Sequence, residues 1–375
     1  MWQDVWWKGL SVTLLFVVLV SFVIWGVVYN TSDASMNHVG KRTVTDKVEV
    51  EVSHCGGNKT LARKNYRFRK PMEQPSNVNY TDNIYFSVRT TESNYEERLM
   101  LLMMTWLQVV KHKLTIISDG SHDNIFVKTI KRTGFDIVVT NCFQRHIAHD
   151  LCCKLGEEFA AYYRVREQHH NKEGYQWFCH FDDDVYVNIP QLSQLLQKYD
   201  PHQPHYIGRW REDKHIRPYF SVYNKGAKIQ LKELHYIVKH KVYQFGSGAA
   251  YCISSAMMTE AEKYFNGIRV FQRTCRVTQC NDDVSVGYVL GGLLGYNLTS
   301  VADFNVQYDN LENYTLQEAL QSITIGYTEE KIKQQSKCFS LITNLVPVEA
   351  RFDDDPTRFL SYHCLLYPSV SWCKR

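Results

Sequence analysis

Strong net charge and long basic runs are missing from this sequence. The formal net charge is only +4 over 375 residues, and the basic residues fall in short scattered groups. This argues against a nucleic-acid-binding protein, which would carry a basic patch or stripe. Internal repeats and low-complexity tracts are absent too. The content of 44% hydrophobic and 22% charged residues predicts an ordinary globular protein with one large domain or two modest ones.

Three common chemical motifs are also absent. There is no G-x-S-x-G turn for a serine nucleophile, no Gly-Lys-Ser/Thr that would end a phosphate-binding loop, and no C-x₂-C pair with zinc-finger spacing. The eleven cysteines look structural rather than reactive. Their odd number leaves at least one thiol that is unpaired or paired between chains. Covalent catalysis is therefore not what the sequence predicts.

The N-terminus carries a long uncharged run. Residues 9–32 contain no charged side chain, and residues 10–29 are apolar over a length that can cross a bilayer as a helix. We predict a short cytoplasmic tail over residues 1–8 and a transmembrane signal anchor over residues 9–31. A cleaved signal peptide is the alternative, but the apolar run is longer than the usual core of such a peptide.

The segment after this run predicts a lumenal location. Cysteine-rich sequence with N-glycosylation sequons, following a membrane anchor, is typical of an oxidising compartment. Residues 32–82 are polar and lack periodicity, so we interpret them as a lumenal stem. A small irregular subdomain held by Cys55 remains open. The five sequons begin at Asn30, Asn58, Asn79, Asn297 and Asn313.

Residues 83–375 predict one domain of the α/β class. Apolar strand-like runs alternate with segments of helical spacing, and this alternation favours a mostly parallel central sheet. The predicted strands are residues 83–90, 113–119, 135–141 and 175–181. The predicted helices are residues 96–110, 149–165 and 189–199.

The stretch "FCHFDDDVYVN" (Phe178 to Asn188) places three carboxylates in otherwise apolar, strand-like sequence. In an extended strand Asp182 and Asp184 share a face, at the strand end where α/β sheets place ligands. Two carboxylates there are hard oxygen ligands for Mg²⁺ or Mn²⁺, which would bridge a diphosphate. Asp183 would face differently and hold the loop or a ribose. His180 could be a ligand, although a packed strand histidine is the commoner case.

A solvated acidic turn is the alternative for such a triple. The chain contains one for comparison, "RFDDDPTRF", in which Asp353 to Asp355 precede Pro356 and follow no apolar strand of this kind. We interpret that second triple as a loop, with Asp355 placed to cap a helix. Context separates the two triples.

Two further stretches are ambiguous from the residues alone. Asp282 and Asp283 in "CNDDVSVGYVLGGLLG" precede a helix-like run, so they are either a helix N-cap or the site of a general base. Gly246 and Gly248 in "YQFGSGAAYCISS" either form a tight turn or let the backbone approach a ligand closely. From the residues alone, the structural interpretation (a helix N-cap for the first stretch and a tight turn for the second) is the stronger one.

Four stretches in this order resemble the Fringe proteins, which are β-1,3-N-acetylglucosaminyltransferases of the Golgi. They are "QWFCHFDDDVYVN", "FGSGAAYCIS", "NDDVSVGY" and "YHCLLYPSVSWCKR". The resemblance covers the chain from about Asn83 to its C-terminus. It implies a GT-A-like nucleotide-sugar transferase fold, and a Golgi membrane protein of type II with its catalytic domain in the lumen.

The resemblance also implies a reaction and its residues. Asp184 would be the direct Mn²⁺ ligand, with Asp182 and Asp183 completing the metal and nucleotide-sugar contacts. Asp283 would be the catalytic base that deprotonates the 3-hydroxyl of O-linked fucose on EGF-like repeats of Notch-type receptors. The donor would be UDP-N-acetylglucosamine (UDP-GlcNAc), and one displacement would invert the anomeric centre. The residues assigned to the nucleotide sugar are Thr90, Thr91, Arg98, Asp182, Asp183, Gly246 and Gly248.

The family's disulfides map onto cysteines of this chain. The resemblance implies bridges between Cys142 and Cys153, between Cys179 and Cys252, and between Cys364 and Cys373. Cys275 and Cys280 are a further candidate for a local pair.

The chain departs from the family at one metal-binding position. Family members carry "FHSHLE" where this chain has "FNVQYDNLE", so the metal-binding histidine falls on Gln307 and the other histidine on Asn305. Either Gln307 or a neighbour such as Asp303 or Asp309 substitutes, or metal use is altered. Residues 210–243 also form a longer segment than the family core has, and this segment is a candidate for shaping acceptor choice.

Two other functions stay open at this level. A β-1,3-galactosyltransferase of the core-1 type shares the metal motif and the acidic pair. A catalytically silent, membrane-anchored relative that modulates adhesion or a receptor is the alternative from a different class, and the missing histidine is the feature that favours it.

Overall fold

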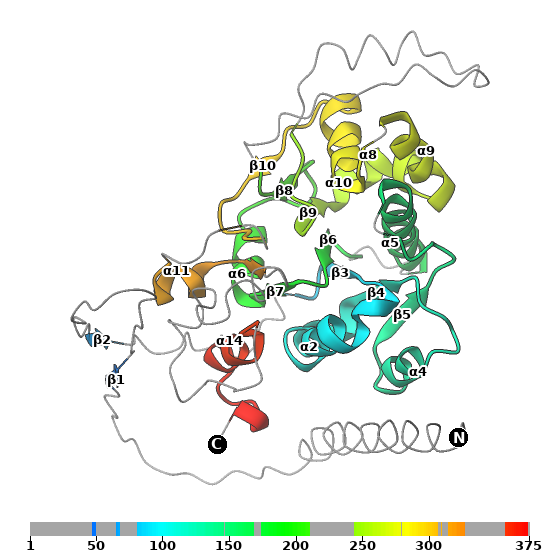
Figure 1. The fold of residues 1–375 in the computed structure, drawn as a ribbon. Helices are drawn as coiled ribbons and strands as arrows, with labels where there is room; N and C mark the ends of the chain where they lie inside the picture. The colour runs from blue at the N-terminus through cyan, green and yellow to red at the C-terminus, as the bar shows by residue number, and fades with distance from the viewer. Residues whose placement is uncertain are drawn as a thin grey trace, which may run out of the picture.

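The structure is a computed structural model, and it describes the predicted α/β domain with several gaps (Figure 1). The predicted anchor and most of the predicted stem lie outside the described residues, as do Gln307 and the segment 211–243. Within the described ranges, no helix has the length and apolar character needed to cross a membrane. The described residues are 47–49, 65–67, 81–145, 147–168, 174–210, 244–278, 280–306, 309, 314–326 and 357–373.

A seven-stranded sheet is the centre of the fold, with strand order β10-β8-β9-β6-β3-β4-β5. All neighbouring pairs are parallel except those of β9, which runs antiparallel to both β6 and β8. The α/β class with a mostly parallel sheet is therefore confirmed. The strands are β3 (Ile84–Arg89), β4 (Leu114–Ser118), β5 (Asp136–Val139), β6 (Trp177–Asp182), β8 (Tyr206–Gly208), β9 (Ala250–Ser254) and β10 (Thr299–Ser300).

Two smaller sheets accompany it. The strand β7 (Val185–Val187), which follows the acidic triple, pairs antiparallel with β11 (Thr324–Gly326). The strands β1 (Lys47–Glu49) and β2 (Asn65–Arg67) form an antiparallel pair of their own.

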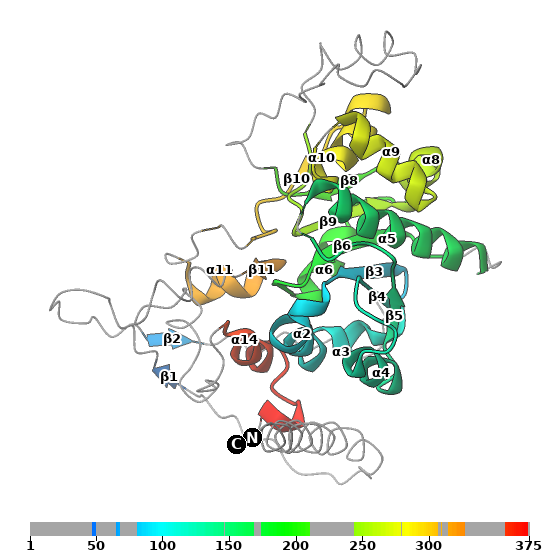
Figure 2. The same ribbon diagram turned by 45° about the vertical axis from the view of Figure 1, so that its right-hand side comes forward.

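Helices cover both faces of the large sheet, as Figures 1 and 2 show. Side chains alternate along β3, so Phe86 and Val88 pack into one core and Tyr85 into the other. The Tyr85 side is covered by α5 (Ala148–Gln168), α8 (Ser255–Phe265), α9 (Ile268–Thr278) and α10 (Asp282–Gly287). The other side is covered by η2 (Tyr95–Leu99), α2 (Met100–Met104), α3 (Leu107–Val110), α6 (Ile189–Leu196) and α14 (Phe359–Leu366).

The remaining elements are short or lie at the rim. They are η1 (Glu92–Asn94), η3 (Lys111–Lys113), α4 (Ile125–Arg132), η4 (Tyr288–Leu293), α11 (Leu316–Gln321) and η6 (Ser371–Cys373).

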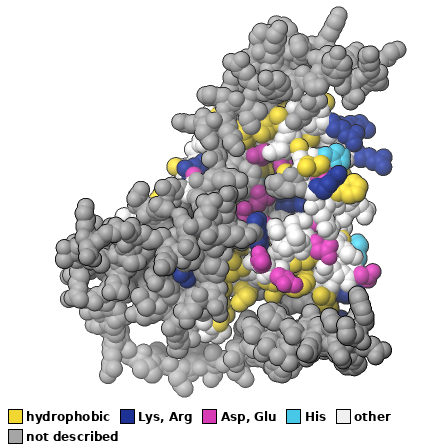
Figure 3. All heavy atoms as spheres, in the orientation of Figure 1, with side chains coloured by type: hydrophobic (Ala, Val, Ile, Leu, Met, Phe, Trp, Pro, Cys, Tyr) yellow, Lys and Arg dark blue, Asp and Glu magenta, His cyan; other side chains and the backbone are white. Residues whose placement is uncertain are grey.

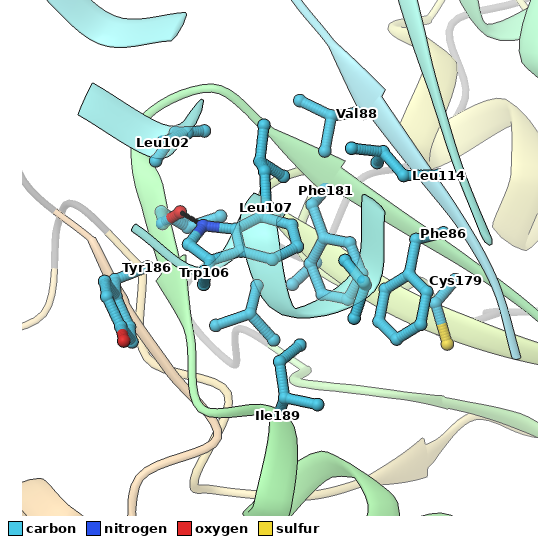
Figure 4. Packing of buried hydrophobic residues seen from close by; sticks show 14 of the residues in the cluster. Phe86, Val88, Leu102, Trp106, Leu107, Leu114, Cys179, Phe181, Tyr186 and Ile189 are labelled. Atoms are coloured by element: carbon cyan, nitrogen blue, oxygen red, sulfur yellow. Dashed lines mark hydrogen bonds between the residues drawn. The ribbon is translucent and has the colours of Figure 1, made fainter. Parts of the chain in front are cut away.

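Trp106 anchors the strand that follows the acidic triple. Its indole packs edge-on against Phe181 of β6, with 5.5 Å between ring centroids, and its Nε1 donates a hydrogen bond to the Val185 carbonyl at 3.2 Å (Figure 4). The turn that carries Asp183 and Asp184 is thus held between two strands that are both fixed to the core.

The long helix predicted over residues 96–110 is interrupted. Thr105 leaves the helical region with φ −116° and ψ −120°, and its hydroxyl donates to the Leu101 carbonyl at 2.9 Å. A threonine hydroxyl that bonds to the preceding turn competes with the helical ladder. The apolar pattern therefore located the buried segment but did not reveal the break.

The three disulfides that the resemblance implies are present in the structure. They join Cys142 to Cys153, Cys179 to Cys252 and Cys364 to Cys373.

The expected local pair of Cys275 with Cys280 is wrong. Cys275 on α9 bonds instead to Cys152 on α5, 123 residues away in sequence, because these two helices pack face to face. Cys280 is the free cysteine of the described residues.

Candidate functional site

The acidic triple lies at the carboxyl end of β6, in the turn that leads to β7. β6 ends at Asp182, so the alternation of a strand does not reach Asp184, which lies in the turn. Instead, Asp183 and Asp184 both face Arg98, whose Nη1 lies 3.2 Å from Asp183 Oδ1 and 3.7 Å from Asp184 Oδ2. Acidic and basic side chains meet in the middle of the face shown in Figure 3.

The hydrogen-bonding capacity of the Asp183 carboxylate is taken up by other side chains of the protein. Its Oδ2 accepts hydrogen bonds from Thr90 Oγ1 at 2.7 Å and from Asn94 Nδ2 at 3.0 Å, in addition to the Arg98 contact. Burial raises the pKa of this carboxyl, and Arg98 opposes that rise. Asp183 thus joins β3 and the following turn to the acidic triple.

Asp184 is the carboxylate that remains available. Its Oδ1 is buried and has no hydrogen-bond partner among the described residues. Burial first, and then the nearby Asp182 and Asp183, raise the pKa of Asp184 well above its usual range. A buried oxygen without a partner calls for an explanation, and an unplaced cation is a common one. Hard cations bind through one or two carboxylates together with substrate phosphates, so this oxygen fits the implied Mn²⁺.

Arg89 links the triple to the second acidic pair. Its Nε and Nη2 donate to Asp182 Oδ1 at 3.1 Å and 2.7 Å, and its Nη1 donates to Asp282 Oδ2. Burial opposes ionisation of Asp282, but Arg89 outweighs it and lowers the pKa of that carboxyl. Asp182 is therefore engaged in a nearly buried ion pair, which leaves it less free than Asp184 to bind a metal.

Asp283 lies beside this ion pair in the first turn of α10. Asn281 occupies the N-cap position, although its side chain makes no capping bond, so neither aspartate serves as the N-cap. Asp283 is partly exposed, and burial together with Asp282 raises its pKa to about 7. A carboxylate with a pKa near neutrality suits a general base.

The two glycines of the 244–249 loop differ in their surroundings. A Cβ built on Gly248 would lie 3.2 Å from Asp283 Oδ2, so this glycine lets the backbone approach the candidate base closely. Gly246 faces Tyr206 and Tyr251 instead, and its N–H donates to the Tyr206 hydroxyl at 2.7 Å. Close packing against the two tyrosines therefore explains why a glycine is needed at position 246. Closeness to Asp283 explains why one is needed at position 248.

Thr91 lies at a second polar cluster beside the triple. Its Oγ1 donates to Asp119, with 2.8 Å and 2.9 Å to the two carboxylate oxygens. Asp119 follows β4, and it also accepts from Lys154 Nζ of α5 at 2.8 Å and from the Glu92 N–H at 3.1 Å. The carboxyl ends of β3, β4 and β6 therefore form one continuous polar edge of the sheet.

The sequence analysis missed Arg89, Asp119 and Lys154, and also Glu158, whose carboxylate lies 2.7 Å from His180 Nδ1 on β6. A signal for two of them was present: Lys154 and Glu158 lie four residues apart among buried apolar positions of α5, where charged side chains need partners. Arg89 likewise ends an otherwise apolar strand.

Two of the three substitutes considered for the missing histidine, Asp303 and Asp309, are described, and neither has a recorded contact with the triple. Asp309 Oδ2 and Asn305 Oδ1 both accept from Arg209 Nη1, at 2.9 Å and 2.7 Å, and Asp303 is exposed. Gln307 lies outside the described residues. Among the described residues, no group of three or more His, Cys, Asp or Glu side chains is arranged to hold a metal. Of the acidic triple, Asp184 is the carboxylate with an oxygen that no described residue engages.

Comparison with known proteins supports one family. The Fringe-like family model matches residues 79–370. The β-1,3-N-acetylglucosaminyltransferase radical fringe of Notophthalmus viridescens is 27% identical over 346 residues, which are 92% of this chain and 78% of that protein. Radical fringe of Gallus gallus is 31% identical over 293 residues, which are 77% of this chain and 70% of that protein.

A solved structure of mouse xyloside xylosyltransferase 1 in its apo form also aligns with this chain. It is 10% identical, covers 66% of this chain and 98% of its own, and has a TM-score of 0.35. A score this low supports no argument.

Proposed function

This chain belongs to the Fringe-like family and is a glycosyltransferase, and from that premise we propose its donor, acceptor and mechanism. It transfers N-acetylglucosamine from UDP-GlcNAc to the 3-hydroxyl of O-linked fucose on EGF-like repeats of Notch-type receptors. The reaction inverts the anomeric centre, within a GT-A-like fold. The observation that carries the proposal is Asp283, a partly exposed carboxyl with a pKa of about 7 beside the acidic triple.

Asp283 acts as the general base. It accepts the proton of the fucose hydroxyl while that oxygen forms a bond to the anomeric carbon and the bond to UDP breaks. The single displacement converts the α linkage of the donor to a β linkage in the product. Because its pKa lies near 7, about half of Asp283 is ionised at pH 7, and the ionised form is basic enough to take the proton.

Arg98, Asp184 and Asp182 bind and orient the donor. Arg98 is partly exposed beside Asp183 and Asp184, so its guanidinium can also reach a diphosphate. Asp184, with Asp182, would hold Mn²⁺, which when bound offsets negative charge on the departing diphosphate. Arg89 holds Asp182, and Thr90 holds Asp183, in place before substrate arrives.

A transfer assay tests this proposal. The detergent-solubilised chain is incubated with Mn²⁺, an O-fucosylated EGF-like repeat, and UDP-GlcNAc or UDP-galactose in parallel. We expect transfer of N-acetylglucosamine alone. Preferential transfer of galactose would favour the core-1-type alternative. No transfer from either donor by the folded chain would favour a catalytically silent relative.

We propose the cellular placement on the sequence alone. The uncharged run over residues 9–31 supports a Golgi membrane protein of type II, with residues 1–8 in the cytoplasm and the catalytic domain in the lumen. Protease protection of the catalytic domain in intact Golgi vesicles, lost on adding detergent, tests that orientation. Digestion in intact vesicles would refute it.

A further inference from the structure

A fully buried pair, His180 and Glu158, lies behind the candidate base. His180 is on β6, two residues before the acidic triple, and Glu158 is on α5. The imidazole Nδ1 lies 2.7 Å from Glu158 Oε2, and neither side chain is exposed to solvent. The ring also stacks on Tyr251 of β9, with 4.9 Å between centroids. Burying such a pair carries a desolvation cost, so its retention calls for an explanation.

Both ring nitrogens of His180 face acceptors. Nδ1 faces the Glu158 carboxylate, and Nε2 lies 2.9 Å from the backbone carbonyl of Gly248. A carboxylate and a carbonyl can only accept hydrogen bonds, so the ring donates to both. The carboxylate thereby orients the imidazole toward Gly248, in the way that an outer carboxylate fixes a ligating histidine.

Gly248 transmits this placement to Asp283. A Cβ added to Gly248 would lie 3.2 Å from Asp283 Oδ2, so the loop backbone runs directly beside the carboxylate. The loop is held on either side by backbone hydrogen bonds, from Ser247 N to the Arg209 carbonyl at 2.9 Å and from Asp182 N to the Ala249 carbonyl at 3.0 Å. The hydrogen bond from His180 holds the residue between them, which is the one that touches the base.

We propose that Glu158 and His180 are positioning residues that set the surface against which Asp283 rests. They contact neither donor nor acceptor. The chain Glu158–His180–Gly248 fixes the loop backbone from the inside of the sheet, and the loop fixes the carboxylate for attack. The inference rests on the proposed role of Asp283. A misplacement of about 1 Å at a reacting group costs about 100-fold in rate, so the loss of this support is measurable.

Two substitutions separate the two hydrogen bonds of His180. His180→Gln places an amide N–H near the position of Nε2 and can keep the bond to the Gly248 carbonyl. His180→Asn places its amide near the position of Nδ1 and can keep only the contact with Glu158. Each variant loses one hydrogen bond: His180→Gln leaves the buried Glu158 carboxylate without its partner, and His180→Asn leaves the Gly248 carbonyl without its partner and removes one methylene more.

The experiment measures kcat, the KM for UDP-GlcNAc and the melting temperature of the full chain and both variants. We expect His180→Asn to lower kcat about 100-fold and His180→Gln to stay within about tenfold, with the donor KM changed less than about threefold in both. The assay is run well below the melting temperatures of all three proteins, so that a difference in stability does not itself change kcat. A merely structural histidine would instead give equal losses of kcat in the two variants, or losses that track the melting temperature.

The outcomes distinguish this inference from the proposed function. Equal losses of kcat in a chain whose wild type transfers N-acetylglucosamine would overturn the positioning role alone. A wild-type chain that is folded and transfers nothing would overturn the proposed function, and the positioning role with it.

Discussion

The Arg89 guanidinium and the Asp282 carboxylate form a buried ion pair between residues 193 positions apart in the sequence. Arg89 also binds Asp182, so one side chain at the end of β3 joins the acidic triple to the acidic pair. The two motifs that the sequence showed separately are therefore one electrostatic unit in the fold. Arg89 holds this unit together, although it belongs to none of the motifs found in the sequence.

Replacing Arg89 should destabilise the protein. Arg89→Met leaves Asp282 buried without its cation, and breaking a buried pair in this way costs on the order of 3–5 kcal/mol. Urea unfolding monitored by tryptophan fluorescence measures the loss. Arg269→Ala is the control, because Arg269 is exposed and makes no ion pair with a described residue, and it should change stability by less than about 0.5 kcal/mol. Equal stability of the two variants would contradict the role of the ion pair.

The pH dependence of transfer should report Asp283. Burial and Asp282 raise its pKa to about 7, and a general base works only when deprotonated. Activity, measured as kcat/KM, should therefore rise as the pH increases through about 7 and level off above about pH 8. Asp283→Asn should lose at least about 100-fold and show no such rise. A profile whose acid limb is centred near pH 4 would mean that another group is the base.

Gly248 should not tolerate a methyl group. The Cβ of Gly248→Ala would meet Asp283 Oδ2 at 3.2 Å and displace the base or the loop, and we expect a drop in kcat on the order of 100-fold. Gly174→Ala is the matched control, since a Cβ at Gly174 meets no atom within 4 Å. The steady-state kinetics of both variants decide the point. An active Gly248→Ala enzyme would show that the close contact is unimportant.

Metal dependence should separate Asp184 from Asp183. Asp184 has a buried oxygen without a partner, whereas Asp183 is fully hydrogen-bonded by protein groups. Chelation with EDTA should abolish transfer, and Mn²⁺ should restore it. In Asp184→Asn the Mn²⁺ concentration for half-maximal activity should rise at least about tenfold. Asp183→Asn should lower the melting temperature and leave that concentration within about threefold. Full activity in EDTA would show that Gln307 marks altered metal use.

His363 should make the protein sensitive to acid. Its Nδ1 lies 2.7 Å from the Tyr186 hydroxyl in the core beneath α14, and burial lowers its pKa from 6.5 to about 4. The folded state therefore favours the neutral ring. The stability that the neutral ring confers is complete above about pH 6.5 and is lost as the pH falls toward about 4. The full difference is on the order of 3 kcal/mol.

The matched variant for this prediction is His363→Asn, which cannot titrate but places its amide near the position of Nδ1 and can still bond to the Tyr186 hydroxyl. Its free energy of unfolding should fall less than that of the wild type between pH 7 and pH 4.5. Parallel pH curves for the two proteins would show that His363 is not the sensor.

Local patterns in the sequence located most of the elements and the candidate groups. Apolar alternation and helical spacing predicted the strands and helices of the α/β domain, because burial of one face imposes a period on the residues that form it. The context of the triple after an apolar strand separated Asp182–Asp184 from Asp353–Asp355. Resemblance to a family added the role of Asp283 and three disulfides, because those depend on motifs whose order along the chain is visible.

The connections between these groups were decided by packing alone. Arg89 with Asp282, His180 with Glu158 and Gly248, and Cys152 with Cys275 each join residues that lie on different elements. No period or spacing relates such partners. Their separation along the chain depends on the lengths of the loops between elements. Their distance in space depends on how β3, β6 and β9 pair in the sheet and how α5 and α10 pack on it. The sequence therefore identifies the chemical groups of the site. The protonation state of each group, and whether it is free to bind or react, depend on neighbours that only the folded sheet brings together.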